Sequence, residues 1–188
     1  MRRLILTLVL CGLPMIAAAA PVAYTIDPNE TEVGFSYRLA TTKGRGVMPI
    51  DSANLRLDFK KVSRSEVSVV MNAAAASTGL PFVTNAMRGE TVLDTRRFPQ
   101  IRFVSTSVSG GRTGVVVRGN LSIRGVTRPV DLSARFFRKQ DRDPGDLSRL
   151  TILLEGEVSR AAFGAGGFPD LVGDTIKLRI LATIDRAQ

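Results

Sequence analysis

Apolar and polar residues alternate along most of the chain beyond its first twenty positions. In residues 176–184, for example, every second side chain is apolar, from Ile176 to Ile184. This period of two is typical of a β-strand that buries one face, because successive side chains point to opposite sides of a sheet. The alternation predicts eight strands and a weaker ninth one at 47–50; the eight lie at 33–39, 55–60, 67–71, 101–103, 115–123, 130–136, 152–158 and 176–184.

The connections between these stretches are short and rich in Gly, Asp and Pro, as in RGVTRP at 124–129. Short connections of this kind join antiparallel neighbours. Strands with one apolar face and no long amphipathic helix predict an all-β fold, either a sandwich or a barrel. We favour an antiparallel, eight-stranded, up-and-down barrel, because consecutive hairpins that close on themselves leave no sheet edge unpaired. Residues 20–188 are expected to form this single domain.

One segment breaks the alternation. Residues 73–99, AAAASTGLPFVTNAMRGETVLDTRRFP, form a connection that is long for this chain, and long loops are usually functional or disordered. Within it, residues 84–93 are predicted to form a short helix with Thr84 or Asn85 as its cap. The apolar side of this helix would consist of Met87, Val92 and Leu93. The pattern alone fits both a lid over one end of the barrel and a plug that closes that end for stability.

The N-terminus, MRRLILTLVLCGLPMIAAAA, has a different character. Two arginines precede an apolar run from Leu4 to Ile16 and a row of alanines, which is the layout of a secretory signal peptide. The run is too short to span a bilayer, which takes about 20 apolar residues. Cleavage after Ala19 would remove residues 1–19 and release a chain that begins at Ala20 into a periplasmic or extracellular space. Cys11, the only cysteine, would leave with the signal, so the mature chain would have no thiol for a disulfide.

The chain is basic, with 26 Lys and Arg residues against 17 Asp and Glu residues and a formal net charge of +9. Removal of Arg2 and Arg3 leaves 24 against 17, a net charge of +7. The cations are scattered among the polar positions of the predicted strands and form no dense block of the kind found in nucleic-acid-binding arms. We interpret them as the solvated outer face of the barrel and expect no nucleic acid partner.

The residue types that several kinds of catalysis need are missing. The chain has no His, and its one Cys lies in the signal, which excludes imidazole acid–base chemistry, Ser-His-Asp triads and thiol chemistry. The acidic loop DRDPGD at 141–146 contains Arg142 and lacks a later Glu, which predicts a polar hairpin instead of a calcium loop. The glycine-rich FGAGGF at 163–168 precedes Pro169 and no helix pattern, so it predicts a flexible loop and not a phosphate cradle. We expect no metal and no cofactor.

An apolar interior remains as the main feature. The alternation places five aromatic side chains on the inner face of the barrel: Phe35, Tyr37, Phe59, Phe103 and Phe136. An eight-stranded barrel is either filled by its own side chains or holds one small ligand. The alternation fits a filled core and a pocket equally well.

Five stretches, in this order, carry a family resemblance: YTIDPNETEVGFSY, LDTRRFPQIRFVSTSV, VRGNLSIRGVTRPVDL, SRAAFGA and VGDTIKLRILATID. Through them the chain resembles the YceI-like family of periplasmic, lipocalin-like barrels that bind polyisoprenoid lipids. The family's lid segment falls on residues 84–99, where Thr84 and Ala86 replace an acidic residue and a histidine and Met87 replaces a leucine. The positions that match the family pattern are Arg88, Gly89, Leu93, Asp94, Phe98 and Pro99.

This resemblance implies a lipocalin-like barrel whose interior binds or carries a long isoprenoid-type lipid, with the segment 73–99 as its lid, and it is compatible with transient contact with a membrane surface. Two other functions stay open: a carboxylate-dependent enzyme, which a buried Asp or Glu facing a cavity would favour, and a structural or stress-response module with a filled core. The sequence leaves the oligomeric state open. The candidate ligand-binding residues are Phe35, Tyr37, Phe59, Val69, Phe82, Met87, Arg88, Leu93, Phe103 and Phe136.

Processing of the N-terminus gives a first test. Intact mass measurement of the exported protein should show a chain that starts at Ala20, because the small residues Ala17 and Ala19 suit a signal peptidase and Pro21 would hinder a cut directly before it. A mature protein that still carried residues 1–19 would contradict the periplasmic or secreted location.

Overall fold

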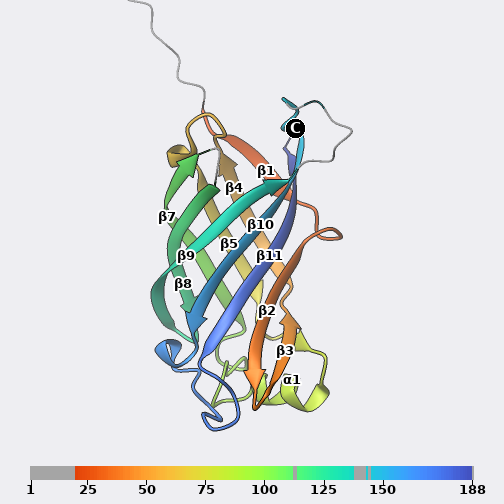
Figure 1. Ribbon diagram of the computed structural model, residues 1–188, viewed down its shortest axis with the longest axis vertical. Coiled ribbons are helices and arrows are strands. Elements are labelled where there is room, and N and C mark those ends of the chain that lie inside the picture. The colour runs from red at the N-terminus through yellow and green to blue at the C-terminus, as the bar shows by residue number, and fades with distance from the viewer. Residues whose placement is uncertain (1–19, 112–113, 138–142, 144, 188) are drawn as a thin grey trace, which may run out of the picture.

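The protein consists almost entirely of strands, with one short helix (Figure 1). The computed structural model describes residues 20–111, 114–137, 143 and 145–187, so the predicted signal at 1–19 lies outside the described residues. The strands are β1 (Val22–Ile26), β2 (Glu32–Leu39), β3 (Thr42–Val47), β4 (Ile50–Leu57), β5 (Glu66–Asn72), β6 (Ser77–Thr78), β7 (Gln100–Gly111), β8 (Gly114–Ile123), β9 (Val126–Phe137), β10 (Arg149–Ser159) and β11 (Thr175–Arg186). The helix is α1 (Pro81–Arg88), and two 3-10 turns lie at Val62–Arg64 and Ala161–Phe163. Among the described residues, no helix is long and apolar enough to cross a bilayer.

The sheet closes on itself. Its antiparallel order is β1, β4, β5, β7, β8, β9, β10 and β11, and β11 pairs back with β1 through Tyr24 opposite Arg186 and Ile26 opposite Ile184. The earlier part of β11, at 177–181, pairs instead with β2, so β1 and β2 together occupy one position of the wall. The prediction of a closed, antiparallel, eight-stranded barrel is therefore confirmed.

The two ends of the barrel differ (Figure 1). The lid end, at the bottom of the view, consists of the β2–β3 turn, the segment 73–99, the β8–β9 turn and the loop 160–174. The terminal end, at the top, contains the start of β1 and the end of β11.

Strand β3 does not follow the alternation of apolar residues, because aromatic rings from β2 cover its inner face. Tyr37 and Phe35 of β2 lie opposite Gly44 and Gly46 of β3. A Cβ atom at Gly44 would come within 2.2 Å of the Tyr37 ring, and one at Gly46 within 2.2 Å of the Phe35 ring. The glycines thus leave room for rings that supply the apolar surface of both strands.

The prediction of a weak strand at 47–50 is wrong, because the chain breaks between β3 and β4 within this stretch. Pro49 lies at the break and has no N–H for a strand ladder, while its carbonyl accepts the Asn72 N–H at 2.8 Å. The short strand β1 was not predicted, although Tyr24 is only 4% exposed and its neighbours alternate around it.

The turn predicted at 124–129 is shorter in the structure. Only Arg124 and Gly125 form it, with φ values of 51° and 76°, which is the two-residue hairpin geometry that matches strand twist. Pro129 lies within β9 opposite Asn120. It is tolerated there because β10 pairs with β9 only from residue 133 onward, so Pro129 is outside the part of β9 that pairs on both sides.

The lid helix begins earlier than predicted. It runs from Pro81 to Arg88, not over 84–93, and Leu80 is its N-cap, so Thr84 lies within it. Proline is favoured at the first helical position, because its fixed φ suits the helix and its missing N–H would have no partner there. The chain leaves the helix at Gly89 and continues through tight turns.

The register of the wall follows the predicted alternation on β7. Ile101 and Phe103 are each 6% exposed and Arg102 between them is exposed. A Cβ atom at Gly119 on β8 would lie 2.4 Å from the Phe103 ring, so the glycine accommodates that ring on the inner face.

Substitutions on β7 test this register. Phe103→Asp should lower the free energy of unfolding by about 4 kcal/mol or more, because it removes a buried ring and places an unpaired charge in the interior. Arg102→Ser should change stability by less than about 0.5 kcal/mol, as expected for an exposed site. Chemical denaturation measures both values, and equal tolerance of the two changes would show that the register is wrong.

Candidate ligand cavity

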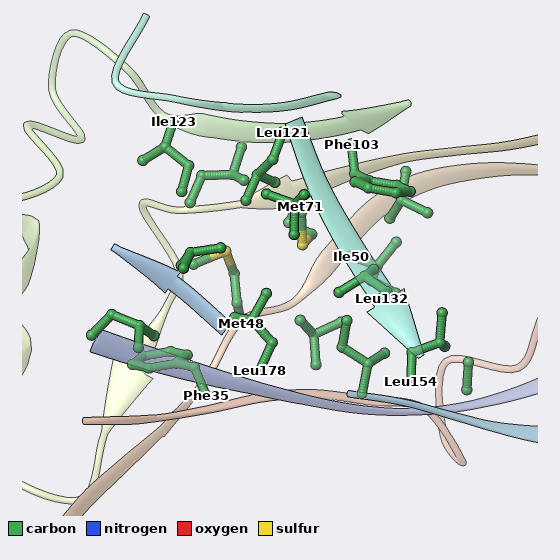
Figure 2. A pocket seen from close by; sticks show the side chains of 18 of the residues that line it. Phe35, Met48, Ile50, Met71, Phe103, Leu121, Ile123, Leu132, Leu154 and Leu178 are labelled. Atoms are coloured by element: carbon green, nitrogen blue, oxygen red, sulfur yellow. The ribbon is translucent and has the colours of Figure 1, made fainter. Parts of the chain in front are cut away.

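The barrel encloses an apolar cavity of about 300 Å³. Of the 46 residues that line it, five carry a polar or charged side chain: Tyr37, Asp58, Ser65, Thr78 and Arg160. Figure 2 shows side chains from strands around the whole barrel pointing into one space, among them Phe35, Met71, Phe103, Leu132 and Leu178. The interior is therefore a pocket and not a filled core.

The cavity extends along the barrel from one end to the other. Phe59 and Phe136 line it near the terminal end, whereas Met87 of α1 and Phe168 of the loop 160–174 line it at the lid end. Because a volume of about 300 Å³ is spread over this length, the cavity is long and narrow. A narrow apolar channel accommodates an extended hydrocarbon chain better than a compact polar molecule.

Aromatic rings pack across the terminal end. The Phe59 ring makes edge-to-face contacts with Tyr24, at a centroid distance of 5.8 Å, and with Phe136, at 5.5 Å. Edge-to-face pairs of this kind are favourable in apolar surroundings. The Tyr24 hydroxyl donates to the Leu147 carbonyl at 2.9 Å, which ties the cluster to the chain before β10.

Asp58 is a buried carboxylate at this end of the cavity, with 7% exposure. It accepts the backbone N–H groups of Lys60 at 2.9 Å and Lys61 at 2.7 Å and the Arg64 Nε–H at 2.8 Å. The Lys61 N–H, followed by the Arg64 guanidinium, lowers the pKa of Asp58 below its usual value against the opposing effect of burial. The carboxylate thus stays ionised, stabilises the turn at 58–65, and is poorly suited to act as a general acid.

The lid end is formed by α1 and the turns that follow it. Val83, Ala86 and Met87 of α1 line the cavity together with Leu93. The Thr84 hydroxyl accepts the Thr78 N–H at 2.9 Å, which attaches the helix to β6. The segment 73–99, which the sequence pattern interprets as a lid or a plug, therefore lies over one end of the cavity.

Arg160 holds the loop 160–174 against the barrel. Arg160 is 7% exposed, and its guanidinium donates to four backbone carbonyls at 2.5–3.1 Å, those of Ala165, Gly167, Val172 and Gly173. A single buried side chain thus fixes the path of the glycine-rich stretch for which the sequence predicts a flexible loop. Residues 141, 142 and 144 of the acidic stretch 141–146 lie outside the described residues, and Asp143 accepts the Gly145 N–H at 2.7 Å.

The structure brings eight of the ten candidate residues together in the cavity wall: Phe35, Tyr37, Phe59, Val69, Met87, Leu93, Phe103 and Phe136. Phe82 is not among them, because it is on the outer side of α1 and is 65% exposed. Arg88 is also outside the wall. Asp58 and Arg160 also line the cavity, but the sequence pattern did not indicate them as candidates. Neither lies at an alternating apolar position, and each follows the end of a strand, where a turn directs it inward.

The sequence leaves open whether Arg88 binds a ligand headgroup at the cavity mouth or caps or pairs within the lid, and in the structure it contacts the backbone of its own segment. Its Nε and Nη2 atoms donate to the carbonyl of Ala76, at 3.0 and 2.7 Å. Ala76 is fully buried, at 0% exposure. Among the described residues Arg88 forms no ion pair, and Asp94 pairs with Arg97 at 3.4 Å.

An antiparallel barrel with eight wall positions and an elongated apolar cavity defines a class of protein, the lipocalin-like barrels, whose interior is wide enough for one small ligand. A family model described as the YceI-like domain matches residues 24–184. The chain therefore belongs to the YceI-like family, as the sequence motifs indicate.

Individual relatives agree with this assignment. Protein YceI of Escherichia coli O17:K52:H18 is 27% identical over 167 residues, which cover 87% of each chain. Among solved structures, BcnA of Burkholderia cenocepacia has a TM-score of 0.75 at 18% identity and covers 85% of this chain and 99% of its own. A protein from Saccharophagus degradans, described as a polyisoprenoid binding domain implicated in plant cell wall breakdown, has a TM-score of 0.64 at 13% identity and covers 88% and 99%. At these identities the two solved structures show the fold alone.

The contact between Arg88 and Ala76 gives a test of the lid. Arg88→Ala should lower the free energy of unfolding by about 1 to 3 kcal/mol, because a buried carbonyl loses two charge-assisted hydrogen bonds. Arg88→Lys should restore only part of this loss, since an ammonium lacks the planar fork. Chemical denaturation gives the stabilities, and binding is measured for a headgroup-bearing lipid and for its bare hydrocarbon analogue. A selective loss of the headgroup-bearing lipid would contradict the scaffold role.

Proposed function

We propose that this protein binds one long isoprenoid-type lipid, such as a polyprenyl or isoprenoid-quinone-like molecule, inside the barrel and carries it through a periplasmic or extracellular space. The observation that carries this proposal is the narrow apolar cavity, which extends between the two ends and is lined by apolar side chains at all but a few positions. The description of one structural neighbour as a polyisoprenoid binding domain supports the choice of lipid. The predicted signal at 1–19 supports the location.

The composition of the wall favours a hydrocarbon chain over a polar ligand. Burial of apolar surface contributes about 25 cal/mol per Å², or about 0.8 kcal/mol per methylene group, before the costs of binding. A sugar or nucleotide in the same place would lose its hydrogen bonds to water and regain few, because most of the wall has no donor or acceptor. An extended isoprenoid chain has no polar groups along its length and fits this wall.

Few polar groups are available to a ligand headgroup. Asp58 and Arg160 are engaged by backbone groups, as described above, and the Ser65 hydroxyl accepts the Asp58 N–H at 3.0 Å. The Tyr37 hydroxyl makes no hydrogen bond to other described residues and belongs to a side chain that lines the cavity. Tyr37 is therefore the group best placed to contact a polar head.

The two alternatives have less support. A carboxylate-dependent enzyme needs a carboxyl group that can exchange protons or attack a substrate, but Asp58, the one acidic side chain in the described cavity wall, is held ionised by its three donors. A structural module with a filled core does not account for the cavity. We therefore propose a binding protein and not an enzyme.

A matched pair of substitutions on β8 tests the proposal. Val117 lines the cavity and is 6% exposed, whereas its neighbour Val116 is on the outer face and is 38% exposed. Val117→Trp should lower lipid affinity about tenfold or more. An indole that takes the space of two ligand methylene groups would leave them unburied, which lowers the binding free energy by about 1.6 kcal/mol. Val116→Trp should leave the affinity unchanged.

The measurement combines binding with identification. Mass spectrometry of an organic extract of the purified protein identifies the bound lipid, and titration of that lipid into each delipidated variant gives the affinity, with thermal unfolding as a folding control. Equal affinities of folded Val117→Trp and Val116→Trp, or a wild-type extract with no lipid and no lipid uptake afterwards, would overturn the proposed function.

A further inference from the structure

Large exposed apolar side chains are concentrated at the lid end. Leu80 and Phe82, at the start of α1, are 46% and 65% exposed, and Phe168 and Leu171, in the loop 160–174, are 47% and 56% exposed. Both segments project from the lid end of the barrel (Figure 1). Single exposed apolar residues are ordinary, whereas several on neighbouring projections indicate an interaction surface.

The loop 160–174 presents its apolar residues on a fixed backbone. The Ala40 N–H donates to the Leu171 carbonyl at 2.7 Å, and the Gly173 N–H donates to the Arg38 carbonyl at 3.0 Å, so the loop is attached to the β2–β3 turn. Phe168 has a φ of 58°, a conformation that is unfavourable for a bulky residue. Hydrogen bonds from the Leu171 and Val172 N–H groups to its carbonyl hold the backbone there, and the Phe168 side chain is half exposed and lines the cavity.

Cations accompany these apolar residues at the lid end. Within residues 38–45, 73–99, 124–128 and 160–174, six Lys and Arg side chains are exposed, against three exposed carboxylates, those of Glu90, Asp170 and Asp174. Among the described residues, Arg97 is the only one of the six cations that forms an ion pair. The six exposed cations are Arg38, Lys43, Arg45, Arg96, Arg97 and Arg128.

We propose that the lid end docks on the surface of a bilayer that contains anionic lipid. Phe82 and Leu171 would enter the boundary between headgroups and acyl chains, and the unpaired cations would contact lipid phosphates, which is how apolar and basic residues together bind membranes. A bilayer fits better than a protein partner, because the apolar residues are on separate projections and not in one groove. The exposed cations also outnumber the exposed carboxylates on these segments, which favours an anionic surface.

The docking surface is continuous with the cavity. Phe168 is exposed and also lines the cavity, so a lipid at this end could pass between the bilayer and the barrel without crossing water. The inference rests on the proposed function, because the bilayer would be the source or the destination of the lipid that the barrel binds. The docking itself is measured independently of lipid uptake.

The absence of tryptophan from the sequence permits a direct measurement. Phe82→Trp introduces a single fluorophore at the lid end, and Phe137→Trp introduces one at the terminal end, where Phe137 is 48% exposed and outside the cavity wall. Vesicles of brominated phosphatidylglycerol and phosphatidylcholine should quench the first variant and leave the second unquenched. Raising the salt concentration should weaken the quenching, because salt screens the cations. Equal quenching of both variants would overturn the orientation and with it the proposal.

Charge and apolar variants give a second measurement by vesicle co-sedimentation. The double variant Lys43→Gln, Arg45→Gln should bind anionic vesicles about tenfold more weakly than wild type, and so should Phe82→Ser, Leu171→Ser. The controls at the terminal end, Lys60→Gln with Lys61→Gln and Phe137→Ser, should bind as wild type does, and thermal unfolding verifies that all variants fold.

The outcomes separate the two proposals. Absence of wild-type binding to anionic vesicles, or equal losses in the lid-end and terminal-end variants, would overturn docking and point to a protein partner, even if the purified protein carries lipid. Docking by a protein that neither carries nor takes up lipid would instead support this inference while overturning the proposed function.

Discussion

The structure depends on the pairing of β11 with two strands on one side. On one side of β11, residues 177–181 pair with β2 and residues 184–186 pair with β1. On the other side, β10 pairs with almost the whole length of β11. Without the short pairing to β1, the sheet would have two free edges near the terminal end and the cavity would open sideways to water. Closure therefore separates the apolar interior from water along this part of the wall.

The wall combines stability with an empty interior. At roughly 24 cal/mol per Å³, an unfilled cavity of about 300 Å³ lowers stability by several kcal/mol. Rings placed over glycines, such as Phe35 over Gly46 and Phe103 against Gly119, fill the space next to the wall and leave the axis open. A bound lipid would replace the missing contacts, so ligand binding and folding stability are coupled.

Three arginines organise the lid end by binding backbone carbonyls. Arg88 binds the Ala76 carbonyl, Arg124 binds those of Val92 and Gly164, and Arg160 holds the loop 160–174. The guanidinium group suits this role, because its five N–H donors are arranged in a rigid plane and are always charged. These contacts keep α1 and the loop in place beside the cavity, where the apolar residues of the proposed docking surface project from them.

The sequence by itself determined most of the strands and which face of each is buried, because alternation is a local property that each strand shows independently of its partners, as on β7 where Phe103 is inside and Arg102 outside. It also indicated eight of the cavity-lining residues and the family. Tertiary structure decided the rest. Gly44 and Gly46 form a strand because rings from β2 cover them. Phe82 faces outward because the helix begins at Pro81. Arg88 binds a carbonyl that is distant from it along the chain, and Arg160 binds carbonyls that a folded loop presents. The size of the cavity was beyond the sequence as well, since it is the volume left after all strands have packed, and no single segment encodes it.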